Sequence, residues 1–233
     1  MKIVTTHPTA SGIETHKGPS LGLVACVTIV LFTLNVLAYN VLTDGARYPR
    51  PLESAGAARD YFQRFPGVLR ISSFFQLGAA ISIGIFTATI TSLLRFLGQK
   101  VAGVNIALFG GITGATFLAV SSVLTWVQSH PDISGNLSTM RVVQLAVFAS
   151  GGTVHVALLG LLLAGISIPC LLSDLMPKWL CWLGLLTAAV SELVSLGFIF
   201  SDFFILLPVA RFASLLWLAG AGFKITKIRT VIT

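Results

Sequence analysis

Charged residues are scarce in this sequence, and so are cysteines. Asp, Glu, Lys and Arg make up 10% of the 233 residues, whereas a typical soluble domain has about 25%. A chain with so little charge lacks the polar surface that a domain needs to face water on all sides. Its three cysteines, Cys26, Cys170 and Cys181, lie in or beside apolar segments and form no CxxC pair. They predict neither a disulfide framework nor a zinc site.

The usual signatures of catalysis and of cofactor binding are also missing. The sequence contains no HExxH, no GxSxG and no phosphate-binding loop. No lysine lies within a predicted membrane span, which excludes a retinal Schiff base. His155 is the only histidine within a span, so paired histidine ligands for haem are disfavoured unless His130, at a loop edge, contributes. We therefore predict no cofactor and no metal site, and nothing in the motifs marks the chain as an enzyme.

The basic residues are not gathered as nucleic-acid binding requires. The formal net charge is +7, from 15 basic and 8 acidic residues. A nucleic-acid interface needs its cations on one soluble face, with a recognisable module, and the sequence offers neither. Cations in loops and tails instead favour contact with anionic lipid headgroups. The lipid bilayer is the partner that the charge pattern predicts.

Long apolar runs are what the chain has in abundance. Hydrophobic residues make up 55% of it, and its mean hydropathy is +0.91. A helix needs about 20 predominantly apolar residues to cross about 30 Å of hydrocarbon, and six runs are long enough. We therefore predict an all-α, polytopic transmembrane helical bundle with six spans, in the domain 20–223. The predicted spans are 21–42, 69–94, 101–127, 142–168, 179–200 and 203–223.

The segments outside the spans are short, apart from one loop. Residues 1–19 are predicted to be a disordered cytoplasmic tail, and residues 224–233 a basic cytoplasmic tail. The loop at 43–68 is extracytoplasmic in this topology and holds a short amphipathic helix that lies at the membrane interface. The first apolar run exceeds the 7–15 residues of a signal-peptide core, so it is predicted to be a span.

The orientation follows from the basic residues of the loops, which gather on the cytoplasmic side. With the N-terminus inside, the turn at 201–202 lies outside and has no cation, whereas both inside turns have at least one. We expect both termini in the cytoplasm, and the protein in the plasma (inner) membrane. The same topology places 8 cations inside, namely Lys2, Lys17, Arg95, Lys100, Lys178, Lys224, Lys227 and Arg229, and 6 outside, namely Arg47, Arg50, Arg59, Arg64, Arg70 and Arg141.

Three ionisable side chains lie within predicted spans, where such groups are costly and face the bundle interior or an aqueous cavity. They are His155, Glu192 and Arg211. Glu192 and Arg211 lie on consecutive antiparallel spans, at depths that agree within about one turn at about 1.5 Å per residue, which predicts an ion pair. One interpretation is an anion site or proton-coupled gate. The other is a structural pair that locks the last two spans together.

A second set of polar residues extends this candidate site. Gln144 and His155 are eleven residues apart and so return to nearly the same helix face, and Gln76 lies on the second span. The hypothesis is a ligand or proton site formed by His155, Glu192, Arg211, Gln144 and Gln76. The alternative is that these groups only make hydrogen bonds between helices.

Several stretches of the chain resemble a bacterial family. These are FPGVLRISSFFQLGAAISIGIF at 65–86, ALFGG at 107–111, GGTVHVALLGLLLAG at 151–165, LMPKWLCWLGL at 175–185 and LLPVARFASLLWLAGAGF at 206–223. Over about 54–223 the sequence resembles a family of six-span integral membrane proteins that is classed as a domain of unknown function. The resemblance implies a bacterial plasma membrane and six spans, and it implies no activity.

Three functions remain open on the sequence. The first is a membrane protein that binds or transports a small molecule or ion through an intramembrane cavity in the outer half of the bilayer. The second is a non-catalytic accessory or structural subunit, whose polar residues hold the bundle together. The third is a membrane enzyme that acts on a lipid-soluble substrate. A cavity that reaches the polar residues favours the first, and a dry ion pair favours the second.

Overall fold

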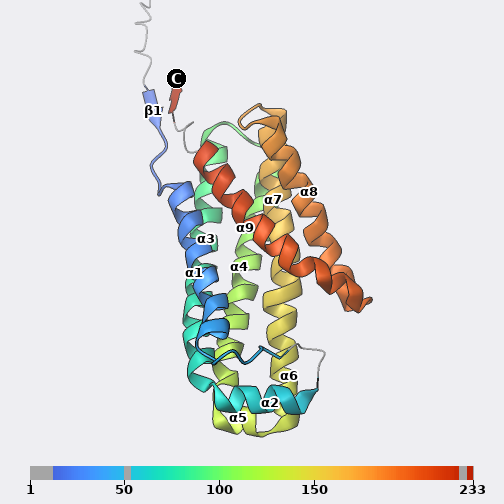
Figure 1. Ribbon diagram of the computed structural model, residues 1–233. Helices are drawn as coiled ribbons and strands as arrows, with labels where there is room; N and C mark the ends of the chain where they lie inside the picture. The colour runs from blue at the N-terminus through green and yellow to red at the C-terminus, as the bar shows by residue number, and fades with distance from the viewer. Residues whose placement is uncertain (1–12, 50–53, 226–229, 233) are drawn as a thin grey trace, which may run out of the picture.

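The structure is a computed structural model, and it describes residues 13–49, 54–225 and 230–232. Six of its helical segments are long and apolar enough to cross a membrane. They run roughly side by side as a bundle (Figure 1). The predicted all-α bundle of six spans is thereby confirmed, and the chain is a multi-pass membrane protein by the length and composition of its helices.

The six segments are built from helices of three kinds. Spans one to three are single α-helices, whereas span four joins two α-helices through a π-helix, and the last two contain 3₁₀ turns. Their bounds are α1 Leu21–Val41; α3 Pro66–Phe96; α4 Ala102–Gln128; α6 Leu137–Phe148, η1 Ala149–Val154 and α7 His155–Leu172; α8 Lys178–Leu193 and η2 Val194–Phe198; and η3 Ser201–Ile205 and α9 Leu206–Ile225.

Two short helices and two short strands complete the described chain. Helices α2 (Ala55–Arg64) and α5 (Pro131–Gly135) lie across one end of the bundle, which we call the α2 end (Figure 1). Strands β1 (Ile13–Thr15) and β2 (Thr230–Ile232) pair antiparallel at the opposite end, which we call the terminal end. Both ends of the described chain therefore lie at the same end of the bundle. Which side of a membrane this is stays a prediction.

The structure differs from the expected boundaries in three places. The fourth span is longer than 142–168, because α7 continues past Pro169, which packs tightly on Gly103 of α4. Part of the expected loop after the third span forms α5. Of the tail expected to be disordered, 1–12 lie outside the described residues, and the chain is already in a strand at residue 13. In the basic tail, 226–229 and 233 also lie outside them.

The helices form a closed ring. Along it, α1 packs on α3, α3 on α4, α4 on α6 and α7, α7 on α8, α8 on α9, and α9 back on α1. Glycines permit the closest contacts: a Cβ at Gly222 of α9 would lie 2.9 Å from the backbone of Leu21 in α1. Where no hydrophobic force drives association in lipid, such small residues let helix backbones approach.

Local sequence signals account for helix starts at the α2 end. Pro66 occupies the first turn of α3, where its missing N–H costs no hydrogen bond. The side chain of Asn136 caps α6 by accepting a hydrogen bond from the Thr139 amide at 3.0 Å. Helix α2 packs against the N-terminal turns of α3 and α6, because its fully buried Phe62 lies in one cluster with Leu69 of α3 and Met140 of α6. The α2 end is therefore a packed layer.

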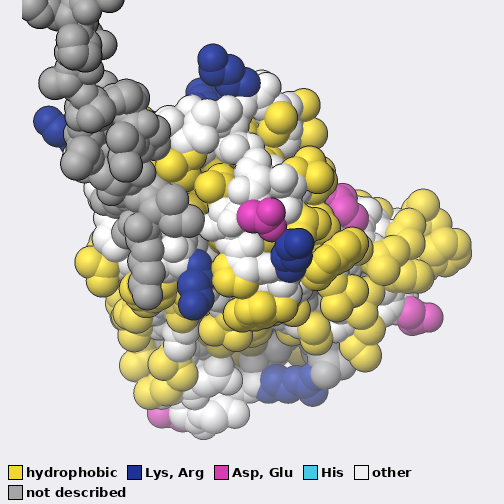
Figure 2. Space-filling model, turned by 90° about the horizontal axis from the view of Figure 1, so that it is seen from above, with side chains coloured by type: hydrophobic (Ala, Val, Ile, Leu, Met, Phe, Trp, Pro, Cys, Tyr) yellow, Lys and Arg dark blue, Asp and Glu magenta, His cyan; other side chains and the backbone are white. Residues whose placement is uncertain are grey.

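The outer surface of the bundle is apolar. Large side chains such as Phe74, Phe109 and Leu186 are exposed on the sides of the helices. Viewed from the terminal end, hydrophobic side chains form much of the visible edge of the molecule, and charged side chains are scattered over the near face (Figure 2). So large an apolar surface is unfavourable in water and is compatible with hydrocarbon. The surface thus agrees with six helices that face lipid.

The last helix crosses the bundle obliquely, and this crossing creates the cavity described below. Near the terminal end α9 lies on α1, where a Cβ at Gly22 would lie 2.3 Å from the ring of Phe223. The contact continues to the middle of α1, where the rings of Phe212 and Phe32 are 6.0 Å apart. Toward the α2 end α9 moves away from α1 (Figure 1). There the preceding turn packs on the fourth span, with Phe204 and Phe148 4.9 Å apart. Toward the α2 end, α9 therefore does not lie between α1 and α6.

Candidate functional site

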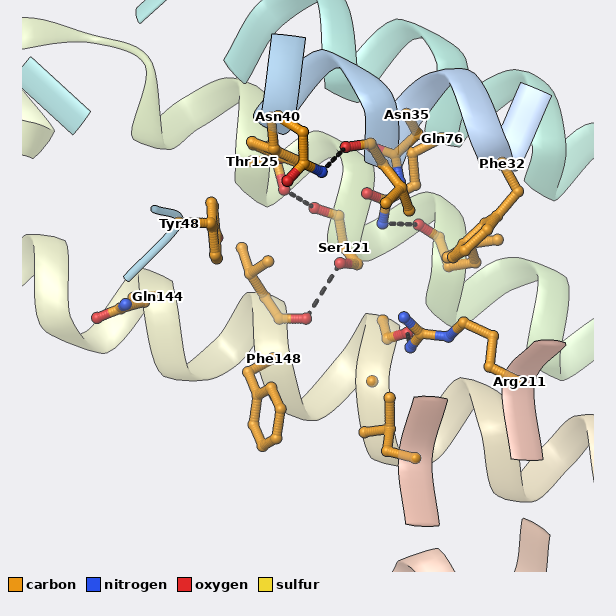
Figure 3. Close-up of a pocket in the computed structure, with 17 residues that line it drawn as sticks. Phe32, Asn35, Asn40, Tyr48, Gln76, Ser121, Thr125, Gln144, Phe148 and Arg211 are labelled. Atoms are coloured by element: carbon orange, nitrogen blue, oxygen red, sulfur yellow. Dashed lines mark hydrogen bonds between the residues drawn. The ribbon is translucent and has the colours of Figure 1, made fainter. Parts of the chain in front are cut away.

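A cavity of about 380 Å³ opens within the half of the bundle nearer the α2 end (Figure 3). Its volume lies within the range of about 300–1,000 Å³ that is usual for small-molecule sites. Helices α1, α3, α4, α6 and α9, the π-helix η1 and the loop after α1 all contribute side chains. The lining residues are Phe32, Asn35, Val36, Tyr39, Asn40, Tyr48, Gln76, Leu118, Ser121, Thr125, Gln144, Val147, Phe148, Gly151, Gly152, Leu207 and Arg211.

Among the described residues that line the cavity, Arg211 is the only one with a charged side chain. Its Nη2 donates a hydrogen bond to the Gly151 carbonyl, and its guanidinium lies over the Phe32 ring, 5.3 Å from the centroid. Its Nε is buried and has no hydrogen-bond partner among the described residues. No carboxylate from the described part of the chain lines the cavity beside it. The site therefore presents a half-buried cation with an unused N–H donor at Nε.

The π-helix shapes the wall opposite Arg211. A single π-helical turn inside an α-helix is rare and is often found at functional sites. Here it contains Gly151 and Gly152, both buried. A Cβ at Gly151 would lie 2.1 Å from the hydroxyl of Ser121, so only glycine fits where η1 meets α4. The close approach also leaves the Gly151 carbonyl accessible to Arg211.

Amide and hydroxyl groups line the rest of the cavity. Gln76 donates to the Leu118 carbonyl at 3.3 Å, and Asn40 donates to the Val36 carbonyl at 2.8 Å. The Ser121 hydroxyl donates to the Val147 carbonyl at 3.1 Å. Each of these groups spends one donor on a backbone carbonyl, and the amide oxygens of Gln76 and Asn40 remain as acceptors. The cavity thus has acceptors along its walls and its strongest donor at Arg211.

The loop after α1 covers the cavity at the α2 end, and we call residues 46–49 the strap. It crosses from α1 toward α6 in front of α4 (Figure 1). Gln144 fastens it by donating to the Pro49 carbonyl at 3.5 Å, while Gln144 itself accepts from Arg141 at 3.0 Å. The Tyr48 ring packs 4.7 Å from that of Tyr39. The strap therefore covers the cavity on the side nearest the α2 end of the bundle.

Three of the five predicted site residues line the cavity, namely Gln76, Gln144 and Arg211. Gln144 lies at the far end of the cavity from Arg211 (Figure 3) and holds the strap. His155 is buried outside the lining. Its Nδ1 lies 2.8 Å from the Gly114 carbonyl, and since a carbonyl only accepts, Nδ1 carries the proton. His155 therefore links α7 to α4.

Glu192 lies apart from the cavity, and the predicted ion pair with Arg211 was wrong. Its side chain is exposed, and its Oε1 lies 3.2 Å from the position of a Cβ on Gly160 of α7. Helices α8 and α9 are antiparallel neighbours as expected. Equal depth, however, does not fix how each helix is rotated about its axis. The ion pairs recorded among the described residues, Arg59–Asp60 and Lys178–Asp174, are exposed.

Sequence reasoning missed two parts of the site. Tyr48 lies in a loop, where no periodicity assigns a side chain to a face. The π-helix carries a weak signal, the pair Gly151–Gly152 within an otherwise apolar run. Glycine pairs in spans more often serve helix packing, so this pair alone does not reveal a cavity wall.

A second, smaller hollow of about 260 Å³ lies between α3 and α4, apart from the first. It is lined by Arg70, Ser73, Phe74, Leu77, Ser122, Val123 and Trp126. Arg70 is exposed there, and its Nε donates to the Ser129 hydroxyl at 3.2 Å. Arginine and tryptophan at a span end are typical of contact with lipid headgroups.

Comparison with models of protein families, with curated proteins and with solved structures finds no match. The interpretation of the cavity therefore rests on its own geometry and chemistry.

Proposed function

We propose that this protein binds a small molecule that carries an acidic oxygen group, a carboxylate or a phosphate, in the cavity at Arg211. The proposal includes the bacterial plasma membrane as its location and both termini in the cytoplasm. In that orientation the cavity lies in the outer half of the bilayer. Binding is the core of the proposal, and transport of the same molecule is its extension.

The observation that carries this proposal is the unneutralised charge of Arg211. Removing a guanidinium from water costs several kcal/mol unless an anion or several hydrogen bonds compensate. One carbonyl and the face of Phe32 compensate in part, and a cation–π contact contributes about 0.5–2 kcal/mol. A bound carboxylate or phosphate supplies the missing charge and accepts from the fork of N–H donors that arginine presents.

The remaining lining suits the neutral part of such a ligand. Phe32, Phe148 and Leu207 offer apolar contact, and Gln76 and Asn40 offer amide oxygens. Pockets for small molecules commonly combine a mostly apolar wall with a few polar groups that fix orientation. Among the described residues, the lining holds neither a carboxylate nor a histidine.

The test is the unfolding temperature of the purified protein in phosphatidylcholine nanodiscs, with butyrate, octanoate or palmitate added. A ligand that binds only the folded state raises this temperature with concentration. We expect at least one of the acids to raise it for the wild type and none to raise it for Arg211→Gln. The matched control is Arg70→Gln, which removes an arginine near the same end of the bundle but outside the cavity and should respond like the wild type.

The proposal fails if no acid stabilises the wild type more than the alcohol of the same chain length does. It also fails if Arg211→Gln responds to the acids as fully as the wild type. Arg211→Lys separates charge from geometry: a retained but weaker response shows that the cation matters and that the fork of donors adds to it.

One observation favours the second function, an accessory subunit. Glu192 is an exposed carboxylate on a span, and such groups in a membrane normally find a partner. A neighbouring protein with a basic residue in a span fits this position. Cross-linking in native membranes tests it, because a neighbour captured by the wild type and lost from Glu192→Gln supports an accessory role.

A further inference from the structure

We infer that the cavity is filled sideways from the membrane, and that its ligand is an acidic amphiphile with a single alkyl chain. The acid group lies at Arg211 and the chain leaves between α1 and α6 into the hydrocarbon. This inference rests on the proposed function and names its class of ligand and its route of entry.

The first step is the closure of the cavity toward the α2 end. The strap lies over it, and Tyr48 stands in an aromatic cluster with Tyr39, Tyr61 and Phe62, at ring distances of 4.7, 5.6 and 5.9 Å. Thr43 holds the start of this loop, because its single hydroxyl donor lies within reach of two carbonyls, those of Tyr39 at 2.9 Å and Ala46 at 3.0 Å. A polar solute from water meets this packed layer first.

The second step is the closure toward the terminal end. Phe32 and Phe212 meet just beyond Arg211, with their centroids 6.0 Å apart. Further along, a Cβ at Gly22 of α1 would lie 2.3 Å from the ring of Phe223 in α9. Helices α1 and α9 are thus in tight contact on the side of the Arg211 guanidinium that faces the terminal end. No route for a ligand runs between them toward the terminal end.

The third step is the open side. In the described chain α1 and α6 do not pack along one another, and toward the α2 end α9 lies against the fourth span and not between them. The cavity lining includes Val36 and Asn40 on one side and Phe148 and Leu207 on the other, and we call the space between these two pairs the lateral window. The side chains next to it on the outer surface, Leu37 and Leu145, are 45% and 39% exposed. These leucines face lipid, so the lateral window does too.

The geometry then sets the chemistry of the ligand. Phe32 and Asn40 are eight residues apart on α1, about 12 Å along the helix, so Arg211 lies well below the membrane surface. An anion without an apolar part does not partition to that depth. A molecule with one acid group and an alkyl chain does, since its chain stays in hydrocarbon while its acid group reaches the cation.

The experiment compares acids of increasing chain length in the nanodisc assay, with a variant that narrows the lateral window. We expect palmitate to reach half-saturation at a total concentration at least about tenfold lower than butyrate, with 1-hexadecanol giving no Arg211-dependent effect. Val36→Trp should raise the palmitate concentration required about tenfold. Its control, Leu37→Trp, places the same ring one residue away on the lipid face and should leave it unchanged.

The outcomes separate the two proposals. Butyrate and palmitate acting equally, with both effects lost in Arg211→Gln, overturn lateral entry and leave the anion site standing. Equal palmitate responses of Val36→Trp and Leu37→Trp also overturn lateral entry. No Arg211-dependent response to any acid overturns the proposed function itself. If Val36→Trp does not fold, Asn40→Trp, one helical turn along on the same side of the lateral window, replaces it, with the same expectation.

Discussion

At the scale of single residues, the environment of Arg211 differs from those of Arg70 and Arg141. Arg70 and Arg141 lie at span ends and bond to polar side chains, Ser129 and Gln144. Arg211 lies within its span and bonds to a backbone carbonyl, with Nε left unpartnered. Cations at span ends can reach headgroups, whereas a cation held inward is kept at a cost to stability. Such costs are typical of functional positions.

Glu192 and Arg211 should behave independently in stability. In a double-mutant cycle of Glu192→Gln and Arg211→Met, we expect a coupling free energy below about 0.5 kcal/mol, because the side chains share no contact. Unfolding in one fixed detergent measures it. A buried ion pair would instead give large single effects, about 3–5 kcal/mol each, that the double variant partly recovers. That pattern would contradict the separation of the two residues.

At the scale of elements, glycines decide how closely α4 and α7 approach. A Cβ at Gly165 would lie 2.5 Å from the backbone nitrogen of Ala107, whereas one at Gly84 of α3 meets nothing within 4 Å. We expect Gly165→Ala to destabilise the protein by about 1–3 kcal/mol through overpacking. Gly84→Ala should be neutral or stabilising by up to about 1 kcal/mol, as alanine favours helix. Equal effects in thermal unfolding would refute this account of the interface.

The aromatic cluster under the strap makes a prediction about alkaline pH. Burial raises the pKa of Tyr48 well above its ordinary value and also raises the pKa of Tyr61. Unfolded tyrosines ionise near pH 10, so the stability that the buried phenols contribute is complete below that pH. It is lost as pH rises from there through the folded pKa values. We expect the strap to loosen only above about pH 10.

Ultraviolet absorbance of tyrosinate measures this, since the chain has only three tyrosines. Native protein should ionise fewer of them near pH 10 than unfolded protein does. Tyr48→Phe should lose less stability than the wild type between neutral and alkaline pH, because one of the ionising phenols is gone. Identical titration of native and unfolded protein would show that the cluster is open to water.

At the scale of the whole molecule, the topology can be measured directly. Asp132, on α5, and Asp174, between α7 and α8, are exposed and lie at opposite ends of the bundle. With the native cysteines replaced, a membrane-impermeant maleimide added to intact cells should label Asp132→Cys. It should label Asp174→Cys only after the cells are opened. The reverse pattern would place both termini outside and the cavity in the inner half.

The number of spans was determined by the sequence alone, because a span is a property of a continuous segment. About 20 apolar residues either cross the hydrocarbon or they do not, and no distant contact changes that length. The same local logic predicts that intramembrane polar residues face inward, which holds for Gln76, Gln144 and Arg211. It fails for Glu192, whose side chain is exposed.

Only the tertiary structure decided which polar residues meet. The rotation of each helix about its axis depends on close contacts between segments distant in sequence, such as Gly165 with Ala107 and Gly222 with Leu21. The divergence of α9 from α1 opens the cavity, and the strap covers it. No single segment of the sequence predicts the divergence of α9 or the position of the strap. Both result from packing that is distributed over the whole ring of helices, which is why the cavity appears only when the helices are assembled.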